Sequence, residues 1–112
     1  METLNSLIPD VNALLAMEPE ELAPFIMKLA KQKMQNEMFT EEHITIAFDG
    51  GINVPTVSYP RNREAAVEIA LSETWAWLRI NMLVVPASGI NGRNGWMKFS
   101  RRGVKLLSGQ IQ

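Results

Sequence analysis

The strongest pattern of apolar positions lies in the second half of the chain. Five large apolar residues follow one another there at spacings of four, four, three and four: Val67, Leu71, Trp75, Leu78 and Met82. This spacing keeps them on one side of an α-helix and predicts a single long helix over 61–82. A second apolar line follows another side of the same helix: Ala66, Ala70, Trp77 and Ile80. A helix that is apolar on two sides is usually central in a fold or shared with a partner chain.

Shorter apolar stripes predict two earlier helices, near 9–16 and 20–36, each of which begins with a proline and acidic residues. Pro24 interrupts the second stripe, because a proline inside a helix removes one backbone donor and its ring opposes the carbonyl group of Glu20. We therefore expect either a kink at Pro24 or a regular helix that begins near Ala23.

Residues 40–48 fit two structures. Their β-branched and aromatic side chains favour a strand, whereas Thr40 followed by two glutamates is a good helix start. Of the two, a short helix is the preferred prediction. The glycines at 50 and 51 then end this element, and the stretch as far as Pro60 is expected to be a loop.

Two short apolar runs, 83–86 and 96–99, predict an antiparallel β-hairpin whose connection, 87–95, is a loop rich in glycine and asparagine. A short closing turn of helix is expected over 103–107, followed by a frayed tail over 108–112. The predicted core joins the long helix to the second N-terminal helix through these residues: Val67, Leu71, Trp75 and Leu78 with Leu22, Phe25, Ile26 and Leu29. The predicted fold class is α+β, mainly helical, in a single domain over 1–112.

Composition agrees with a globular domain, because 46% of the 112 residues are hydrophobic and 21% are charged. No apolar run approaches the ~18 residues of a membrane-spanning helix, and the first residues lack the basic and apolar regions of a signal peptide. A cytoplasmic location is the resulting expectation.

Charge divides the chain into two halves. Residues 1–58, the acidic helical half, carry nine Asp or Glu and three Lys or Arg. Residues 59–112 carry three Asp or Glu and eight Lys or Arg. No acidic residue follows Glu73. This asymmetry predicts an anionic partner for the C-terminal half or a head-to-tail charge match within or between chains, and a solvated basic face is the alternative.

Catalytic chemistry finds no support in the residue types present. The chain has no cysteine, which excludes a thiolate nucleophile and a Cys-based metal site, and His43 is its single histidine. The acidic pairs Glu20-Glu21 and Glu41-Glu42 stand where helix starts favour negative charge.

The glycines of the hairpin connection also lack the chemistry of a phosphate loop. Such a loop needs Gly-Lys-Ser/Thr before a helix, whereas Gly89, Gly92 and Gly95 lead into Trp96 and a strand. We therefore expect a non-enzymatic protein with no cofactor, no metal and no small-molecule substrate.

Two stretches of the second half carry a resemblance to known domains: Trp77-Leu78 through Met82-Leu83-Val84, and Trp96 through Arg101-Arg102-Gly103 to Leu106. Together they resemble the C-terminal half of a winged-helix domain, over residues 63–107. Met82 stands where such domains usually have glycine, and Phe99-Ser100 stands in place of Leu-Thr. The resemblance implies a winged-helix-like half over 59–107, although winged helices bind proteins as well as DNA.

Most of the chain also resembles uncharacterised bacterial domains. The shared motifs are Pro19-Glu20-Glu21-Leu22-Ala23, Trp75-Ala76-Trp77-Leu78, and Gly95-Trp96 through Arg101-Arg102-Gly103. This similarity implies no known chemistry.

Two function classes follow. The first is a non-catalytic interaction or assembly module, expected as a homodimer, with these interface candidates: Ala66, Ala70, Trp77 and Ile80. The alternative is a nucleic-acid-binding protein with a basic wing, whose candidate contacts are Arg79, Arg93, Lys98, Arg101, Arg102 and Lys105. Three glutamates on the long helix oppose this alternative, because they would repel a duplex: Glu64, Glu68 and Glu73.

Overall fold

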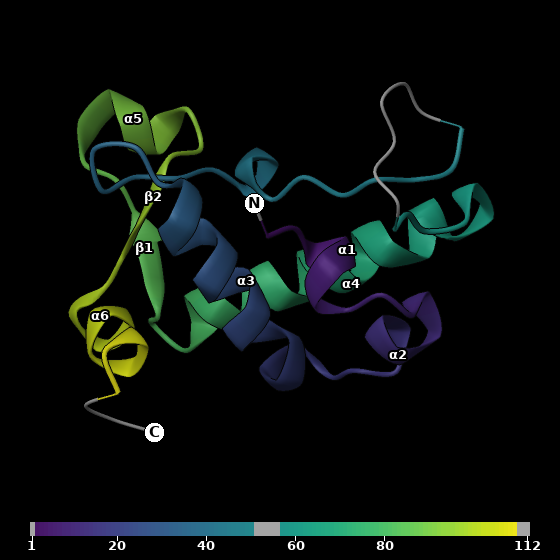
Figure 1. Ribbon diagram of the computed structural model, residues 1–112. Helices are drawn as coiled ribbons and strands as arrows, with labels where there is room; N and C mark the ends of the chain where they lie inside the picture. The colour runs from purple at the N-terminus through teal and green to yellow at the C-terminus, as the bar shows by residue number, and fades with distance from the viewer. Residues whose placement is uncertain (1, 51–56, 110–112) are drawn as a thin grey trace.

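The computed structural model describes residues 2–50 and 57–109. In chain order, the described elements are α1 (Leu4–Leu7), α2 (Val11–Leu15), α3 (Pro19–Lys33), η1 (Glu41–His43), η2 (Arg61–Arg63), α4 (Glu64–Ile80), β1 (Val84–Pro86), α5 (Gly89–Arg93), β2 (Met97–Phe99) and α6 (Arg101–Leu107). Figure 1 shows α3 crossing in front of α4, with α1 and α2 at one end and the strands at the other. The mainly helical α+β fold predicted from the sequence is therefore confirmed.

The predicted hairpin is confirmed. Strands β1 and β2 are antiparallel, with Val84 opposite Phe99 and Pro86 opposite Met97. Phe39, from the segment after α3, forms an isolated antiparallel bridge with Met97. Its N–H donates to the carbonyl of Met97 at 2.9 Å and its own carbonyl accepts from Met97 at 2.7 Å. The hairpin is thereby joined to the N-terminal half of the chain.

The connection 87–95 is not the open loop that we predicted, because it contains the helix α5. Gly92 explains why the chain can coil so tightly there. A Cβ at this position would lie 2.1 Å from the backbone oxygen of Ala87, so only glycine allows the helix to pack against the residue that follows β1. In Figure 1, α5 lies at one end of the hairpin and α6 at the other.

Pro24 lies inside helix α3, which begins before this proline. The helix starts at Pro19, where the Glu21 carboxylate accepts from the N–H of Glu18 at 3.0 Å, and it ends at Lys33 rather than Asn36. The end has a backbone cause, because Met34, the residue after the last turn, has an extended backbone with ψ 146°. The start agrees with the helix predicted over 20–36, the alternative start near Ala23 is wrong, and the helix is three residues shorter than expected at its C-terminal end.

The short helix that we predicted over 40–48 is present only as the single turn η1, and the rest of that prediction is wrong. The remainder is extended because distant groups hold its backbone. Asn5 binds Ala47 through both side-chain amide atoms, and the N–H of Tyr59 donates to the carbonyl of Ala47 at 3.0 Å. The last part of the predicted 49–60 loop, residues 57–60, includes the bridge of Tyr59 to Phe48, and residues 51–56 lie outside the described part of the chain.

The predicted core is confirmed in its main contacts. Six of its eight residues are buried, and Phe25 and Leu71 are half-buried against the same cluster. Trp75 is 2% exposed and stacks on Phe39, with ring centroids 5.9 Å apart. Met82 is the exception to the long apolar stripe, because α4 ends at Ile80 and leaves the Met82 side chain 59% exposed.

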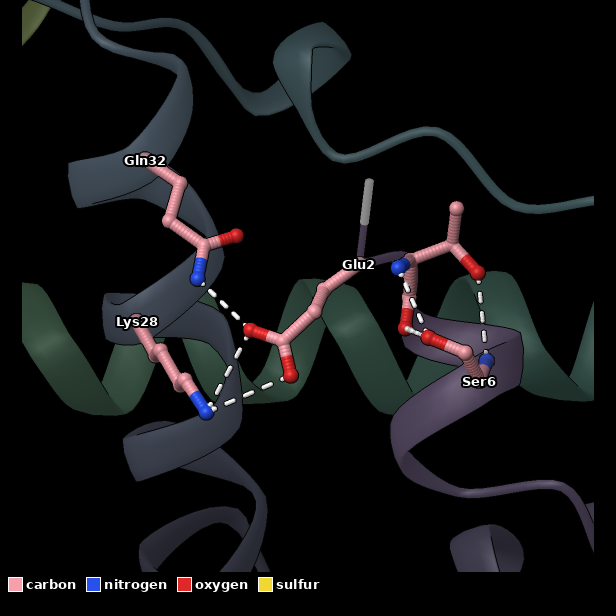
Figure 2. Close-up of polar contacts among 5 residues, drawn as sticks. Glu2, Ser6, Lys28 and Gln32 are labelled. Atoms are coloured by element: carbon pink, nitrogen blue, oxygen red, sulfur yellow. Dashed lines mark hydrogen bonds and ion pairs between the residues drawn. The ribbon is translucent and has the colours of Figure 1, made fainter.

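The N-terminal segment is fastened to α3 by Glu2, as Figure 2 shows. The Glu2 carboxylate accepts from Gln32 at 2.7 Å and from Lys28 at 3.3 Å. These hydrogen bonds, that of Gln32 first, lower the pKa of the Glu2 carboxyl. Next to it, the N–H of Thr3 donates to the Ser6 hydroxyl, and the N–H of Ser6 donates to the Thr3 hydroxyl. These two hydrogen bonds cap the start of α1, a helix that the sequence analysis did not predict.

None of the helices in the described ranges is both long enough and apolar enough to cross a membrane.

Candidate functional site

Helix α6 brings three of the predicted basic contacts to one place. Arg101, Arg102 and Lys105 line a hollow of about 510 Å³ together with Met82 and Ser100. None of the described residues that line it is acidic, and the ion pairs found in the described ranges involve other cations: Lys28, Arg61 and Arg79. We call this site the α6 hollow.

The floor of the α6 hollow is held by hydrogen bonds between α6 and the turn that follows α4. Ser100 begins the helix by accepting from the N–H of Gly103 at 2.9 Å, and its hydroxyl donates to the carbonyl of Met82. Arg102 donates from Nη1 to the carbonyl of Asn81 at 3.2 Å. A Cβ on Gly103 would lie 2.2 Å from the backbone oxygen of Leu83, so this glycine is what lets α6 approach the turn.

Met82 occupies the turn in a backbone conformation that disfavours it. Its φ is 57°, in the left-handed region where a side chain costs roughly 1–2 kcal/mol relative to the right-handed one. Burial does not offset the strain, because the side chain is 59% exposed at the edge of the α6 hollow.

The other three basic candidates are not part of the α6 hollow. Arg79 forms an ion pair with Glu41. Lys98 lines a separate hollow of about 220 Å³ that also contains Glu37. Arg93 is exposed in the last turn of α5. The structure therefore divides the six residues of the predicted basic wing among different surroundings, and brings only those of α6 together.

The predicted interface line on α4 is also divided. Ala70 and Trp77 are half-buried against the core of their own chain, whereas Ala66 and Ile80 are exposed. Trp77 lies in an apolar groove of about 470 Å³ between α3 and α6, beside Pro24 and Leu106. Of the four interface candidates, the structure therefore leaves Ala66 and Ile80 at the surface and packs Ala70 and Trp77 against their own chain.

A different line on α4 faces outward instead. Ile69 is 61% exposed and Ile80 is 79% exposed, and the exposed Ala65 and Ala76 are on the same side. At 100° per residue, all four lie within about 40° of the direction of Ile69. The sequence analysis missed Ile69, although its spacing of eleven positions from Ile80 is about three helical turns and was available as a signal.

His43 has a structural role in η1. Its Nδ1 accepts from the N–H of Thr40 at 3.2 Å, and its ring meets the edge of Trp96 at 5.3 Å between centroids. Across residues 2–50 and 57–109 there is no group of three or more His, Asp or Glu side chains that could hold a metal ion. The acidic pair Glu20-Glu21 lies in the first turn of α3, as helix starts favour.

Comparisons of the chain with protein-family models, with curated proteins and with solved structures give no match.

Proposed function

We propose that the chain is a non-catalytic assembly module that forms a homodimer through the outward face of α4. The observation that carries this proposal is the exposure of two large isoleucines, Ile69 and Ile80, on one side of one helix. Exposed apolar patches on small domains usually mark contact sites. The small residue Ala76 lies between the two isoleucines and allows a second helix to approach closely.

A second copy of the same helix is the partner that fits this face. Along the helix, Ile69 and Ile80 are equally far from the point midway between residues 74 and 75. An antiparallel pair with its twofold axis at that point sets each Ile69 against the partner's Ile80, so that one stripe is complementary to itself. Such isologous twofold dimers are the commonest form of oligomer.

Charge acts on the antiparallel arrangement in two ways. Glu73 lies about 40° from the direction of Ile69 and next to the twofold axis, so its two copies repel each other weakly, whereas a pair of opposite charges favours the arrangement. Glu68 and Arg79 are also eleven positions apart, and both lie roughly 80–100° to the same side of the isoleucine stripe. In the antiparallel pair, each Glu68 therefore comes close to the partner's Arg79. Arg79 binds Glu41 within its own chain, and 44% of its side chain remains exposed for this second contact. Exposed pairs of this kind contribute little energy each, so their main effect is on orientation.

Single cysteines test the geometry directly, because the chain has none of its own. Ala76 lies near the twofold axis, offset from the partner's Ala76 by about 4.5 Å along the helix, whereas two copies of the exposed Ala65, at the end of the same stripe, are about 28 Å apart. Mild oxidation should therefore link Ala76→Cys into a covalent dimer and leave the matched control Ala65→Cys without a covalent link. Equal linkage of both variants, or no linkage of Ala76→Cys, contradicts the antiparallel dimer.

A further inference from the structure

We propose that the α6 hollow binds an unpaired nucleotide of a single-stranded nucleic acid, with α6 cations on its phosphates and Met82 against its base. This site is separate from the α4 face on which the proposed dimer depends. Two observations lead to it, and they concern different parts of a nucleotide.

The first observation is the gathering of cations. Arg101 and Lys105 are four positions apart on α6 and therefore lie on one side of the helix, next to Arg102. No Asp or Glu occurs after residue 73, and no described acidic residue lines the α6 hollow. Arg and Lys side chains in such surroundings attract phosphate oxygens, and Arg102 is already held in place by its hydrogen bond to Asn81.

The second observation is the exposed, strained Met82. Its side chain lines the same hollow as the three cations, so the site presents an apolar thioether beside the phosphate-binding groups. A methionine sulfur makes favourable contacts with aromatic rings, and a nucleotide joins an aromatic base to a phosphate through a sugar. The strain at φ 57° also becomes intelligible, because strained residues concentrate at ligand sites.

Single strands fit the α6 hollow better than duplexes. The bases of a duplex are stacked on each other, so that Met82 could reach only their edges, whereas an unpaired base offers its face. The outward side of α4, the helix that leads to Met82, also carries Glu68 and Glu73, which would repel the second backbone of a duplex. Free mononucleotides share the same chemistry and would be weaker ligands, because they supply fewer phosphates.

The test is a fluorescence anisotropy titration of the full chain with a labelled single-stranded oligothymidylate, repeated over a range of salt concentrations. Each phosphate neutralised on a single strand adds about −0.7 to the slope of log affinity against log salt, so three cations that each meet one phosphate, on the bound nucleotide and its neighbours, predict a slope of about −2. Lys105→Gln should reduce this slope by about 0.7. The charge control Lys31→Gln, an exposed lysine of α3, should leave it unchanged.

Met82→Gly separates binding from folding. Glycine relieves the positive φ, so the melting temperature should rise by a few degrees or stay the same. The affinity for the oligonucleotide should nevertheless fall about 2- to 10-fold, with the salt slope unchanged, because the lost contact is to a base and not to a phosphate.

Competition with adenosine monophosphate and with a duplex of matched length completes the experiment. The proposal predicts that the mononucleotide displaces the oligonucleotide weakly and that the duplex competes less well than the single strand. It is overturned if Lys105→Gln behaves like Lys31→Gln, if Met82→Gly binds as tightly as the natural chain, or if the duplex competes as well as the single strand.

Discussion

Asn5 binds Ala47 with both atoms of its side-chain amide, across 42 positions of the chain. Nδ2 donates to the carbonyl of Ala47 at 3.0 Å, and Oδ1 accepts from its N–H at 2.9 Å. Asn5 is 1% exposed, so this pair replaces the hydrogen bonds that water would otherwise supply. The extended segment after η1 is thereby fixed against α1.

Asn5→Ala should lower the free energy of unfolding by about 1–3 kcal/mol, because the Ala47 N–H loses its partner and the Ala47 carbonyl keeps only the N–H of Tyr59. Urea unfolding followed by tryptophan fluorescence measures the loss. Asn12→Ala is the matched control, since Asn12 is exposed on α2, and its effect should stay within about 0.5 kcal/mol. A loss below about 1 kcal/mol for Asn5→Ala would show that the clamp is dispensable.

Tyr59 stabilises the fold by an amount that is lost at high pH. Its hydroxyl donates to the carbonyl of Ile8 at 2.6 Å, and burial raises the pKa of Tyr59 from 10.0 to about 12. The folded state therefore keeps a proton that the unfolded state loses above pH 10, so this contribution is complete below pH 10 and is lost as the pH rises towards 12.

Unfolding experiments between pH 9 and about 12 should show a decline of about 2 kcal/mol that is specific to Tyr59. Tyr59→Phe supplies the baseline, because it lacks the ionisable hydroxyl and retains the titration of every lysine and arginine. Identical pH profiles for the two proteins would mean that the Tyr59 hydroxyl ionises as easily in the folded state as in the unfolded one.

Gly103→Ala distinguishes tertiary packing from helix propensity. Alanine inside an exposed helix is about 1 kcal/mol more favourable than glycine, so propensity alone predicts that the variant gains stability. The close approach of Leu83 predicts the opposite, a loss of about 2–3 kcal/mol, because a Cβ would meet its backbone oxygen at 2.2 Å. Thermal unfolding gives the sign, and Val104→Ala on the exposed side of α6 serves as the control.

Trp75→Ala should cost about 3–5 kcal/mol, as large-to-small changes in a core do. Trp75 is 2% exposed and packs on Phe39, so its removal leaves a cavity between α4 and Phe39. Chemical denaturation measures the change. A loss below about 1 kcal/mol would mean that Trp75 does not hold the core together.

The parts of the fold that could be predicted are those set by neighbouring residues. The stripe from Val67 to Leu78 is periodic over several turns, and the alternation of short apolar runs around a glycine-rich stretch marks the hairpin. The clamp of Asn5 on Ala47 and the bond of Tyr59 to Ile8 join positions 42 and 51 residues apart. No local pattern signals such contacts, which is why residues 40–48 were predicted as a helix.

The candidate site shows the same division. Arg101, Arg102 and Lys105 are neighbours on α6, so their grouping could be predicted from the sequence. The pairing of Arg79 with Glu41 could not be predicted, because 38 positions separate the two residues. The positive φ of Met82 could not be predicted, because methionine rarely adopts this conformation, and the outward direction of Ile69 depends on which side of α4 the core takes.

Sedimentation equilibrium at micromolar concentration tests the central claim, dimerisation through α4, most directly. The natural chain should give about twice its 12.6 kDa mass. Ile69→Lys, which sets a charge in the stripe, should sediment as a monomer, while the control Ile90→Lys, at a similarly exposed isoleucine of α5, should remain a dimer. A natural chain that sediments as a monomer, or an Ile69→Lys variant that dimerises as well as the Ile90→Lys control, would contradict the account.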